Sequence, residues 1–263
     1  MKPIVLVDGH RDAQVPATDS SVLRGDGCFE AIRSYGGRLF RLDPHLDRLE
    51  RSAAALDLPM PDRGRIAAWA EEVAAESGDS VVRVVITRGG AIPGAPGDGR
   101  CVVIAHDASP VGPVTLWPVR APWHPAGREW ELAGAKTISY AANLAAGRRA
   151  QKHGADDALL LSDDGTVLEG PTFAVAWCRD GEVMTPPLSL GILDSITRRA
   201  VLEVWPDVIE KTDVLEAVLE ADEVFVMSTV KEVSPVVAIG DKRFEPGPVT
   251  REVHQRFRAL VGQ

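Results

Sequence analysis

Residues 132–143 read LAGAKTISYAAN, and they place Lys136 inside a run of small and apolar residues. The chain has six lysines, and the other five lie beside charged, polar or terminal residues, which are typical of a solvated surface. Burying an ammonium group is costly unless the group has a partner or a chemical task. Lys136 is therefore predicted to be a functional residue.

Two further segments complete a chemical set with this lysine. Glu169 is predicted to lie at the end of a strand over 166–169, and a helix is predicted to begin near Ser195 or Ile196. The free N–H groups and the positive dipole end of a helix start favour a phosphate. An amine, a carboxylate and a phosphate cradle are what pyridoxal 5'-phosphate (PLP) requires of a protein, so the sequence predicts a PLP site.

Hydroxyl groups are predicted to line the rest of the phosphate cradle. Thr197 supplies one at the helix start, and a strand over 223–227 places Ser228 and Thr229 at its tip. The alternative for the last two residues is an ordinary turn at a strand end. In the same way, Glu169 could simply cap a turn.

The composition restricts the class of protein. With 263 residues, 45% of them hydrophobic and 25% charged, the chain can bury one large core or two modest ones. A formal charge of -9 gives no general attraction to nucleic acid or to an anionic membrane, so neither is expected as a partner. Three scattered cysteines argue against a disulfide framework and a zinc site. Without a recognisable signal peptide or membrane-length segment, a cytoplasmic location is expected, and no metal.

Hydrophobic periodicity predicts a mixed α/β chain of two domains. A small N-terminal domain is expected over 1–107, a linker rich in proline and glycine over 108–114, and a larger cofactor-binding domain over 115–263. The predicted strands cover 3–7, 28–35, 38–42, 81–88, 100–105, 114–119, a segment ending near Lys136, 158–162, 166–169, 174–178, 182–185 and 223–227. The predicted helices begin at Asp43 and near Arg65, Ala141 and Ser195.

Seven segments together resemble the class IV PLP-dependent aminotransferases of fold type IV. This group includes D-amino acid aminotransferases, branched-chain aminotransferases and 4-amino-4-deoxychorismate lyases. The segments are RGDGCFE at 24–30, HLDRL at 45–49, the Lys136 segment, GADD at 154–157, EG at 169–170, ITR at 196–198 and ST at 228–229. The resemblance covers nearly the whole chain and departs from the family at 171–174.

The resemblance implies a fold, an assembly and a set of roles. The expected fold has a small α/β domain and a larger domain with a mixed, barrel-like sheet, and the expected assembly is a homodimer with the active site near its interface. Lys136 would hold PLP, Glu169 would pair with the ring nitrogen, and Tyr140 would touch the phenolic oxygen. The implied phosphate ligands are Arg48, Ile196, Thr197 and Thr229, and Ser228 is predicted to join them from its place at the strand tip. The alternatives are a surface ion pair for Arg48 and a packing role for Tyr140.

The predicted centre supports two reactions on amino acids. Lys136 would act as nucleophile and base, while the Glu169 carboxylate would favour a protonated ring nitrogen. Transamination to a 2-keto acid and release of pyruvate from aminodeoxychorismate both use this chemistry. A third possibility, a non-catalytic PLP carrier, is disfavoured because a carrier needs no such carboxylate.

Substrate recognition is predicted from arginines. D-amino acid enzymes of the family carry an arginine and a histidine on the loop that here reads GGAIPG at 89–94, and branched-chain enzymes carry a tyrosine near Val81. Both features are missing. Arg24 and Arg88 are the preferred carboxylate ligands, and Arg83 is expected to be buried in or beside its strand. The leading interpretation is a D-amino acid transaminase, followed by the lyase and then a branched-chain L-amino acid aminotransferase.

Overall fold

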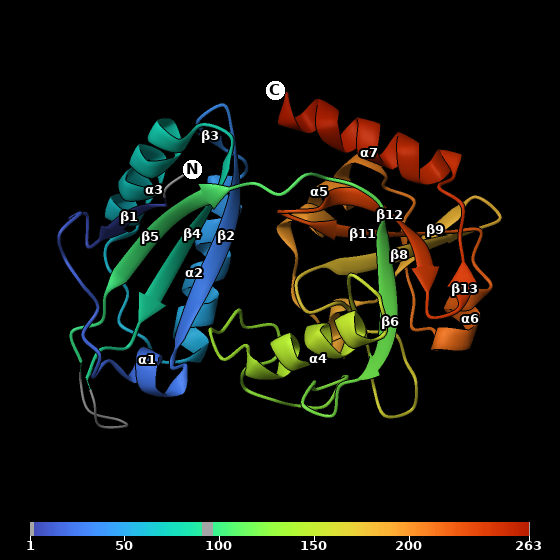
Figure 1. The fold of residues 1–263 in the computed structure, drawn as a ribbon, viewed down its shortest axis with the longest axis horizontal. Coiled ribbons are helices and arrows are strands. Elements are labelled where there is room, and N and C mark those ends of the chain that lie inside the picture. Colours follow the sequence, from blue (N-terminus) through green and yellow to red (C-terminus); the bar gives the residue numbers. More distant parts are fainter. Residues whose placement is uncertain (1–2, 91–96, 263) are drawn as a thin grey trace. The chain divides into compact units, whose positions relative to one another are not determined.

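The computed structural model describes residues 3–90 and 97–262 (Figure 1). The chain divides into two compact units. The first contains Met1–Ser109 and Ala135–Tyr140, and the second contains Pro110–Gly134 and Ala141–Gln263. The first passage between the units lies between Ser109 and Pro110. The return of Ala135–Tyr140 to the first unit was not part of the prediction.

The first unit is built on a five-stranded antiparallel sheet in the order β1-β5-β4-β2-β3. The strands are β1 (Ile4–Val7), β2 (Gly27–Tyr35), β3 (Arg38–Leu39), β4 (Ser80–Thr87) and β5 (Cys101–Asp107). The turn between β2 and β3 uses Gly36 and Gly37 at φ 57° and 87°, which matches the strand twist of a tight hairpin. The five strands predicted for this half are confirmed, with β3 shorter than expected.

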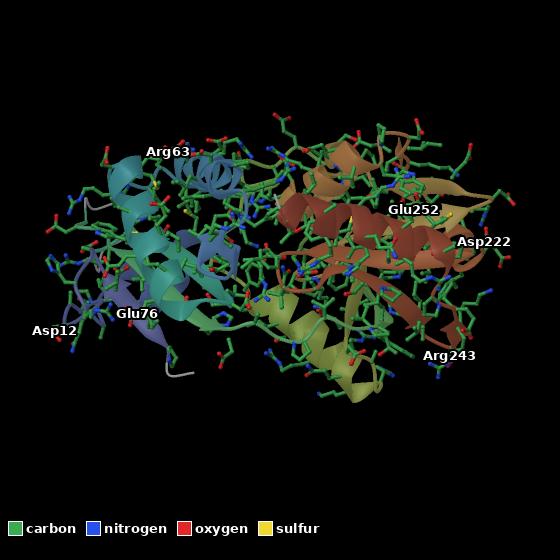
Figure 2. The ribbon with its side chains drawn as sticks, turned by 90° about the horizontal axis from the view of Figure 1, so that it is seen from above. Asp12, Arg63, Glu76, Asp222, Arg243 and Glu252 are labelled. Atoms are coloured by element: carbon green, nitrogen blue, oxygen red, sulfur yellow. The ribbon has the colours of Figure 1, made fainter. Side chains whose placement is uncertain are left out.

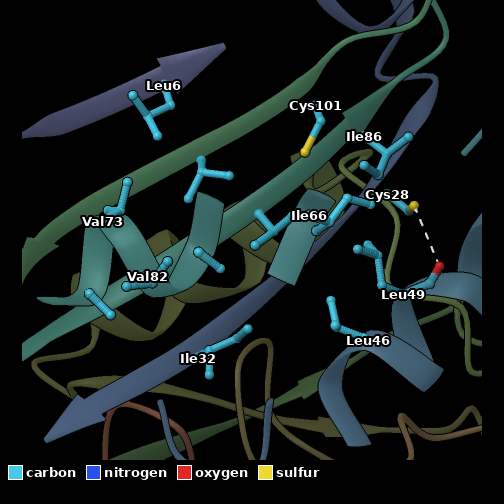
Figure 3. Close-up of a cluster of buried hydrophobic side chains, with 14 of the residues drawn as sticks. Leu6, Cys28, Ile32, Leu46, Leu49, Ile66, Val73, Val82, Ile86 and Cys101 are labelled. Atoms are coloured by element: carbon cyan, nitrogen blue, oxygen red, sulfur yellow. Dashed lines mark hydrogen bonds between the residues drawn. The ribbon is translucent and has the colours of Figure 1, made fainter. Parts of the chain in front are cut away.

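Helices cover one face of this sheet. The unit contains α1 (Ser20–Arg24), α2 (Leu42–Ala55) and α3 (Arg63–Ser77), and the two longer helices pack on the sheet (Figure 1). Alternate β2 side chains, among them Cys28 and Ile32, enter the core beneath them, where Leu49 and Ile66 pack (Figure 3). Charged side chains such as Glu76 lie on the outside (Figure 2).

The second unit contains a mixed sheet in the order β10-β9-β8-β11-β12-β6-β7, and β13 pairs with β12. The strands are β6 (Val114–Arg120), β7 (Asp157–Leu161), β8 (Ala174–Arg179), β9 (Glu182–Thr185), β10 (Ile209–Glu210), β11 (Glu223–Ser228), β12 (Glu232–Ile239) and β13 (Lys242–Arg243). β6 runs parallel to both β7 and β12, whereas β8 and β11 are antiparallel. The predicted mixed sheet is confirmed.

Helices line this second sheet. They are α4 (Ala141–Lys152), α5 (Ile196–Val204), α6 (Leu215–Leu219) and α7 (Pro248–Val261), with a short 3-10 turn, η1 (Leu188–Leu190). α4 packs on β6 and β7, while α5 packs on β11 and α7. Within the two described stretches of chain, no helix has both the length and the apolar character needed to cross a membrane.

Two predicted strands are wrong. The segment leading to Lys136 forms turns and only an isolated bridge between Thr137 and Cys28. The segment 166–169 is reduced to isolated bridges, because its backbone divides its hydrogen bonds between two partners. Val167 donates to the Asp213 carbonyl, whereas Leu168 donates to Leu160. Local periodicity does not reveal such divided pairing.

Candidate functional site

The Lys136 segment is held by backbone contacts inside the first unit. The N–H of Phe29 donates to the Lys136 carbonyl at 3.0 Å, and the N–H of Ile138 donates to Gly27 at 2.9 Å. The Lys136 N–H donates to the Ser52 hydroxyl on α2 at 3.0 Å. Strand β2 and helix α2 therefore fix the backbone on which the lysine side chain stands.

Two glycines make room for this segment. A Cβ atom at Gly25 would lie 2.8 Å from the Ser139 hydroxyl, and one at Gly27 would lie 2.9 Å from Ile138 Cδ1. Gly25 also has φ 73°, a backbone conformation that L side chains rarely adopt. Its carbonyl accepts a hydrogen bond from the Ser139 hydroxyl at 2.7 Å. The glycines of the RGDG stretch are thus required by the lysine segment.

The Lys136 amine lies over aromatic rings on the sheet face opposite the helices. Its Nζ is 4.5 Å from the Phe29 ring centroid and 5.8 Å from that of Tyr140, and the two rings meet edge to face. Arg83 also places its guanidinium carbon 5.0 Å from the Phe29 centroid. Aromatic faces attract cations, so this ring holds an amine and a guanidinium close together.

Arg83 is exposed, which corrects the expectation that it is buried. On β4, the side chains of Val82 and Val84 enter the core, so the residue between them points to the opposite face. The sequence showed a charged residue in an apolar strand but not which face of the sheet lacks a helix layer.

A buried ion pair positions Arg48. Glu30, fully buried on β2, accepts hydrogen bonds from Arg48 Nε and Nη2 at 2.7 Å each, and its Oε2 lies 2.7 Å from His45 Nδ1. His45, Arg48 and Ser52 are spaced three and four residues apart, so they share one face of α2. The alternative role for Arg48, a surface ion pair, is therefore wrong, because its partner Glu30 is buried. The prediction missed Glu30 and His45, although a glutamate within an apolar strand is a signal of a buried charge pair.

Burial and charge compete at this pair. Burial raises the pKa of Glu30, but the charge and hydrogen bonds of Arg48, joined by His45, outweigh burial and lower the pKa to about 2. The pKa of His45 is also lowered, first because the ring is buried and further because the Arg48 and Lys136 charges oppose protonation. The contact with Glu30 acts in the other direction without cancelling these effects. The folded protein thus favours a charged Glu30 and a neutral His45.

Glu30→Gln is expected to reduce the free energy of unfolding at pH 7 by about 3–5 kcal/mol, because it leaves the Arg48 charge buried without its counter-charge. Both lowered pKa values mean that the folded state binds fewer protons than the unfolded state. The His45 contribution should be lost as the pH falls below 6.5, and that of Glu30 as it falls from 4.5 towards 2. Urea unfolding at several pH values measures both effects.

Glu76→Gln is the matched control, because Glu76 pairs with Arg11 on the surface. Exposed pairs contribute about 0–1 kcal/mol. The stability difference between wild type and Glu30→Gln should also shrink in acid. Equal losses from the two variants would show that the buried pair contributes no special stability.

The two predicted substrate arginines have different surroundings. Arg88 is committed to unit 1: its Nε pairs with Asp26, its Nη1 donates to the Asp57 carbonyl at 3.2 Å, and its Nη2 donates to Leu56. Arg24 is exposed at the C-terminal end of α1. The loop residues Ala91–Gly94, part of the stretch read for substrate recognition, lie outside the described residues. Arg83 shares the Phe29 ring with Lys136, whereas Arg88 binds Asp26, Leu56 and Asp57, so Arg83 is the better placed of the two beside the lysine.

Glu169 lies in the second unit, where donors hold both of its carboxylate oxygens. Oε2 accepts the Leu193 N–H at 3.1 Å, and Oε1 lies 3.4 Å from His124 Nε2. A Cβ atom at Gly170 would lie 2.1 Å from the Phe173 ring, so only glycine fits after the glutamate. The prediction did not include His124, and nothing in its local sequence indicated this contact.

The candidate phosphate cradle lies in the same unit. Ser195 caps α5 by accepting the Arg198 N–H at 3.3 Å, and Ile196 and Thr197 are buried in its first turn. The first N–H groups of a helix have no partner within that helix. Because the Leu193 N–H binds Glu169, the approach to α5 lies beside the carboxylate.

The tip of β11 lies next to the Glu169 turn. The Ser228 hydroxyl accepts the Lys231 N–H at 3.0 Å, and the Lys231 Nζ is 5.2 Å from the Phe173 ring centroid. This lysine also pairs with Asp157 and is partly buried, contrary to its predicted place on the solvated surface. The Glu169 turn, the start of α5 and the Ser228–Thr229 tip thus belong to one region of unit 2.

These side chains fit PLP in their chemistry. Unit 2 provides a carboxylate held by donors, a helix start and hydroxyls, which suit a ring nitrogen and a phosphate. Unit 1 provides a lysine amine beside two aromatic rings. The three cysteines are buried, and burial raises the pKa of Cys28 and Cys101 to about 12 and also raises the pKa of Cys178, so all three are core residues.

Comparison with known proteins identifies similar chains. Residues 27–239 match the sequence model of the family described as amino-transferase class IV. A bifunctional aminodeoxychorismate lyase / D-amino acid transaminase of Mycobacterium tuberculosis is 35% identical over 208 residues, which cover 72% of this chain and 71% of that protein.

Solved structures share the fold. The fold IV-transaminase CpuTA1 from Curtobacterium pusillum superposes with a TM-score of 0.84 at 31% identity, covering 95% of this chain and 91% of that one. The branched-chain aminotransferase of Thermoproteus uzoniensis, solved with norvaline, gives a TM-score of 0.87 at 28% identity, covering 98% and 94%. These structures confirm the expected fold type IV.

Proposed function

The chain belongs to the class IV aminotransferase family, whose cofactor is PLP, and we propose that it transfers the amino group of a D-amino acid to a 2-keto acid. One observation carries this proposal: the Lys136 amine and the exposed Arg83 guanidinium lie over the same Phe29 ring. An amino acid brings an amine and a carboxylate together, and a guanidinium binds a carboxylate with two parallel hydrogen bonds. The name of the M. tuberculosis relative supports the D-amino acid preference.

We assign the remaining roles from the surroundings of each residue. When bound, PLP supplies a conjugated ring that accepts electron density from the substrate carbon. Lys136 would bond to the cofactor and then carry a proton at the substrate carbon, while Glu169 would stabilise a protonated ring nitrogen. Tyr140 would contact the phenolic oxygen. The proposed phosphate ligands are Arg48, Ile196, Thr197, Ser228 and Thr229.

Arg83→Met is expected to raise the KM for D-alanine by about tenfold to a hundredfold, because a charge-assisted contact to a carboxylate contributes roughly 1.5–3 kcal/mol. The methionine keeps an aliphatic stem over Phe29 but removes the charge. Activity toward a primary amine that lacks a carboxylate should change far less. Steady-state kinetics with both substrates make the test.

Arg88→Met and Arg24→Met complete the comparison. Arg88 binds Asp26, Leu56 and Asp57, so its replacement should lower stability and leave the ratio between the two substrates unchanged. If Arg88→Met or Arg24→Met alone raises the KM for D-alanine while Arg83→Met does not, the arginines favoured from sequence are the carboxylate ligands.

Two direct assays separate the reactions. Transamination is measured as the 2-keto acid formed from each donor in the presence of 2-oxoglutarate: pyruvate from D-alanine or L-alanine, and the corresponding branched-chain keto acid from L-leucine or L-valine. The lyase reaction is measured as 4-aminobenzoate formed from aminodeoxychorismate. We expect D-alanine to be the preferred substrate. Much faster release of 4-aminobenzoate would assign the chain to the lyases.

We further propose that the chain works in the cytoplasm as a homodimer. Val22 and Leu23 on α1 are 60% and 55% exposed, which suits apolar residues that a second copy covers. The three cysteines are free thiols, as expected in a reducing compartment. Sedimentation velocity should give twice the 28.2 kDa mass of the chain, and a monomer at working concentrations would refute the assembly.

A further inference from the structure

We propose that His124 is a positioning residue, which holds the Glu169 carboxylate in place and stabilises its negative charge. The inference rests on the role proposed above for Glu169. His124 follows β6 in the second unit and is 7% exposed. The same unit contains Glu169, so every contact in this inference lies within one compact unit.

The surroundings of the imidazole select one tautomer. His124 Nδ1 accepts a hydrogen bond from the Ala126 N–H at 3.0 Å. A neutral imidazole that accepts at one nitrogen carries its proton on the other. The proton therefore sits on Nε2, the nitrogen that lies 3.4 Å from Glu169 Oε1. His124 is oriented to donate to the carboxylate.

Hydrogen bonds on both sides of His124 fix its backbone. Its N–H donates to the Ala121 carbonyl at 2.9 Å, and its own carbonyl accepts from Arg128 Nη2 at 3.1 Å. Ala126 has φ 49°, in the left-handed region that residues with a side chain adopt at a cost. This conformation accompanies the turn that brings the Ala126 N–H to Nδ1. The strained backbone of Ala126 therefore lies at the residue whose N–H orients the imidazole.

The Glu169 carboxylate receives its other donor from a different segment. The Leu193 N–H donates to Oε2 at 3.1 Å. The Leu193 N–H and His124 Nε2 therefore approach two different oxygens of the same carboxylate and fix its orientation from two sides. The neighbouring charges are Arg128 on the His124 loop and the ion pair of Asp194 with Arg199 beside Leu193. Among these neighbours, the His124 side chain is the one whose N–H faces a Glu169 oxygen directly.

The first test uses NMR of the protein without cofactor. Long-range 1H–15N spectra should show His124 as the Nε2–H tautomer, and Glu169→Gln should shift the Nε2 resonance while leaving Nδ1 close to its original position. His254 is the internal reference, because its Nδ1 lies 2.9 Å from the Val233 carbonyl. A His124 that only supports its loop through Nδ1 would show no response at Nε2, and this would overturn the proposal.

The second test uses the enzyme with cofactor. His124→Leu should slow single-turnover conversion of D-alanine by about tenfold to a hundredfold, since it removes a hydrogen bond to a charged group. His124→Gln restores a donor at a similar reach and should recover much of this rate. His254→Leu is the control and should keep the wild-type rate. A Gln variant as slow as the Leu variant would count against donation.

A double variant separates this inference from the proposed function. In a Glu169→Gln background, His124→Leu should have little further effect on the single-turnover rate, because the charge it stabilises is gone. A wild-type rate for Glu169→Gln would instead refute the role of the glutamate itself. A slow Glu169→Gln with a fast His124→Leu would refute only the positioning role.

Discussion

Replacing Lys136 by alanine is expected to lower the turnover of D-alanine by roughly a thousandfold or more, because the substitution removes the proposed nucleophile and base together. The fold should survive, since the contacts that hold the segment use the backbone of Lys136 and the hydroxyl of Ser52. Borohydride reduction followed by peptide mapping is the measurement. The wild type should carry the reduced cofactor on the peptide that contains Lys136.

Lys231→Ala is the matched control, because Lys231 also lies over an aromatic ring, with its Nζ 5.2 Å from the Phe173 centroid. This variant should retain the reduced adduct on Lys136. An adduct mapped to Lys231, or to any other lysine of the wild type, would show that the central assignment is wrong. A protein that takes up no PLP at all would remove the basis of the proposed reaction.

Glu169→Gln is expected to slow the single-turnover reaction by about a hundredfold, because the amide no longer supplies negative charge to a protonated ring nitrogen. The surroundings add a second effect. The Leu193 N–H and His124 Nε2 approach the two carboxylate oxygens. In glutamine one of these oxygens is replaced by an NH2 group, which is itself a donor and would oppose the donor on that side. Weaker PLP binding should therefore accompany the slower rate, and cofactor titration measures it.

Glu223→Gln is the control for this variant. Glu223 is also a buried glutamate of unit 2, and its oxygens accept the N–H groups of Val249 and Thr250 at 3.0 and 2.8 Å. Its replacement should reduce stability at the start of α7 and leave the single-turnover rate unchanged. Equal slowing by both variants would indicate a general loss of structure rather than a role for Glu169.

Strands β1–β9 and β11 and helices α2–α5 were predictable because each shows its own periodicity, whereas β10, β12, β13, α1, α6 and α7 were not predicted. The alternation along β2 and the capping serine before α5 are local signals. The lysine segment was not predictable in this way, because its pairing with Phe29 and Gly27 joins residues far apart in sequence. The strand expected over 166–169 failed for a related reason, since its hydrogen bonds go to two different segments.

The site was predictable in its residue types and less so in its supports. Lys136 and Glu169 stand out because a charged group in an apolar setting is unusual. Glu30 gave the same signal but needed the position of α2 to acquire Arg48 and His45 as partners. His124 gave no signal. The surroundings of Arg83 and Arg88 could not be distinguished until the fold placed Arg83 on an exposed position of β4 and Arg88 beside Asp26.

The six residues Ala135–Tyr140 belong to the first unit although the sequence on both sides of them belongs to the second. This arrangement restricts how the gene can be recombined with that of a relative. A chimera that takes residues 1–109 from one relative and the remainder from another would combine Gly25, Gly27 and Ser52 of one parent with the lysine segment of the other. Any side chain larger than hydrogen at the two glycines would collide with that foreign segment. Crossovers that preserve function should therefore come in pairs, so that residues 135–140 travel with the first hundred residues. In a library of recombined genes, functional chimeras should therefore take residues 135–140 and the first hundred residues from the same parent.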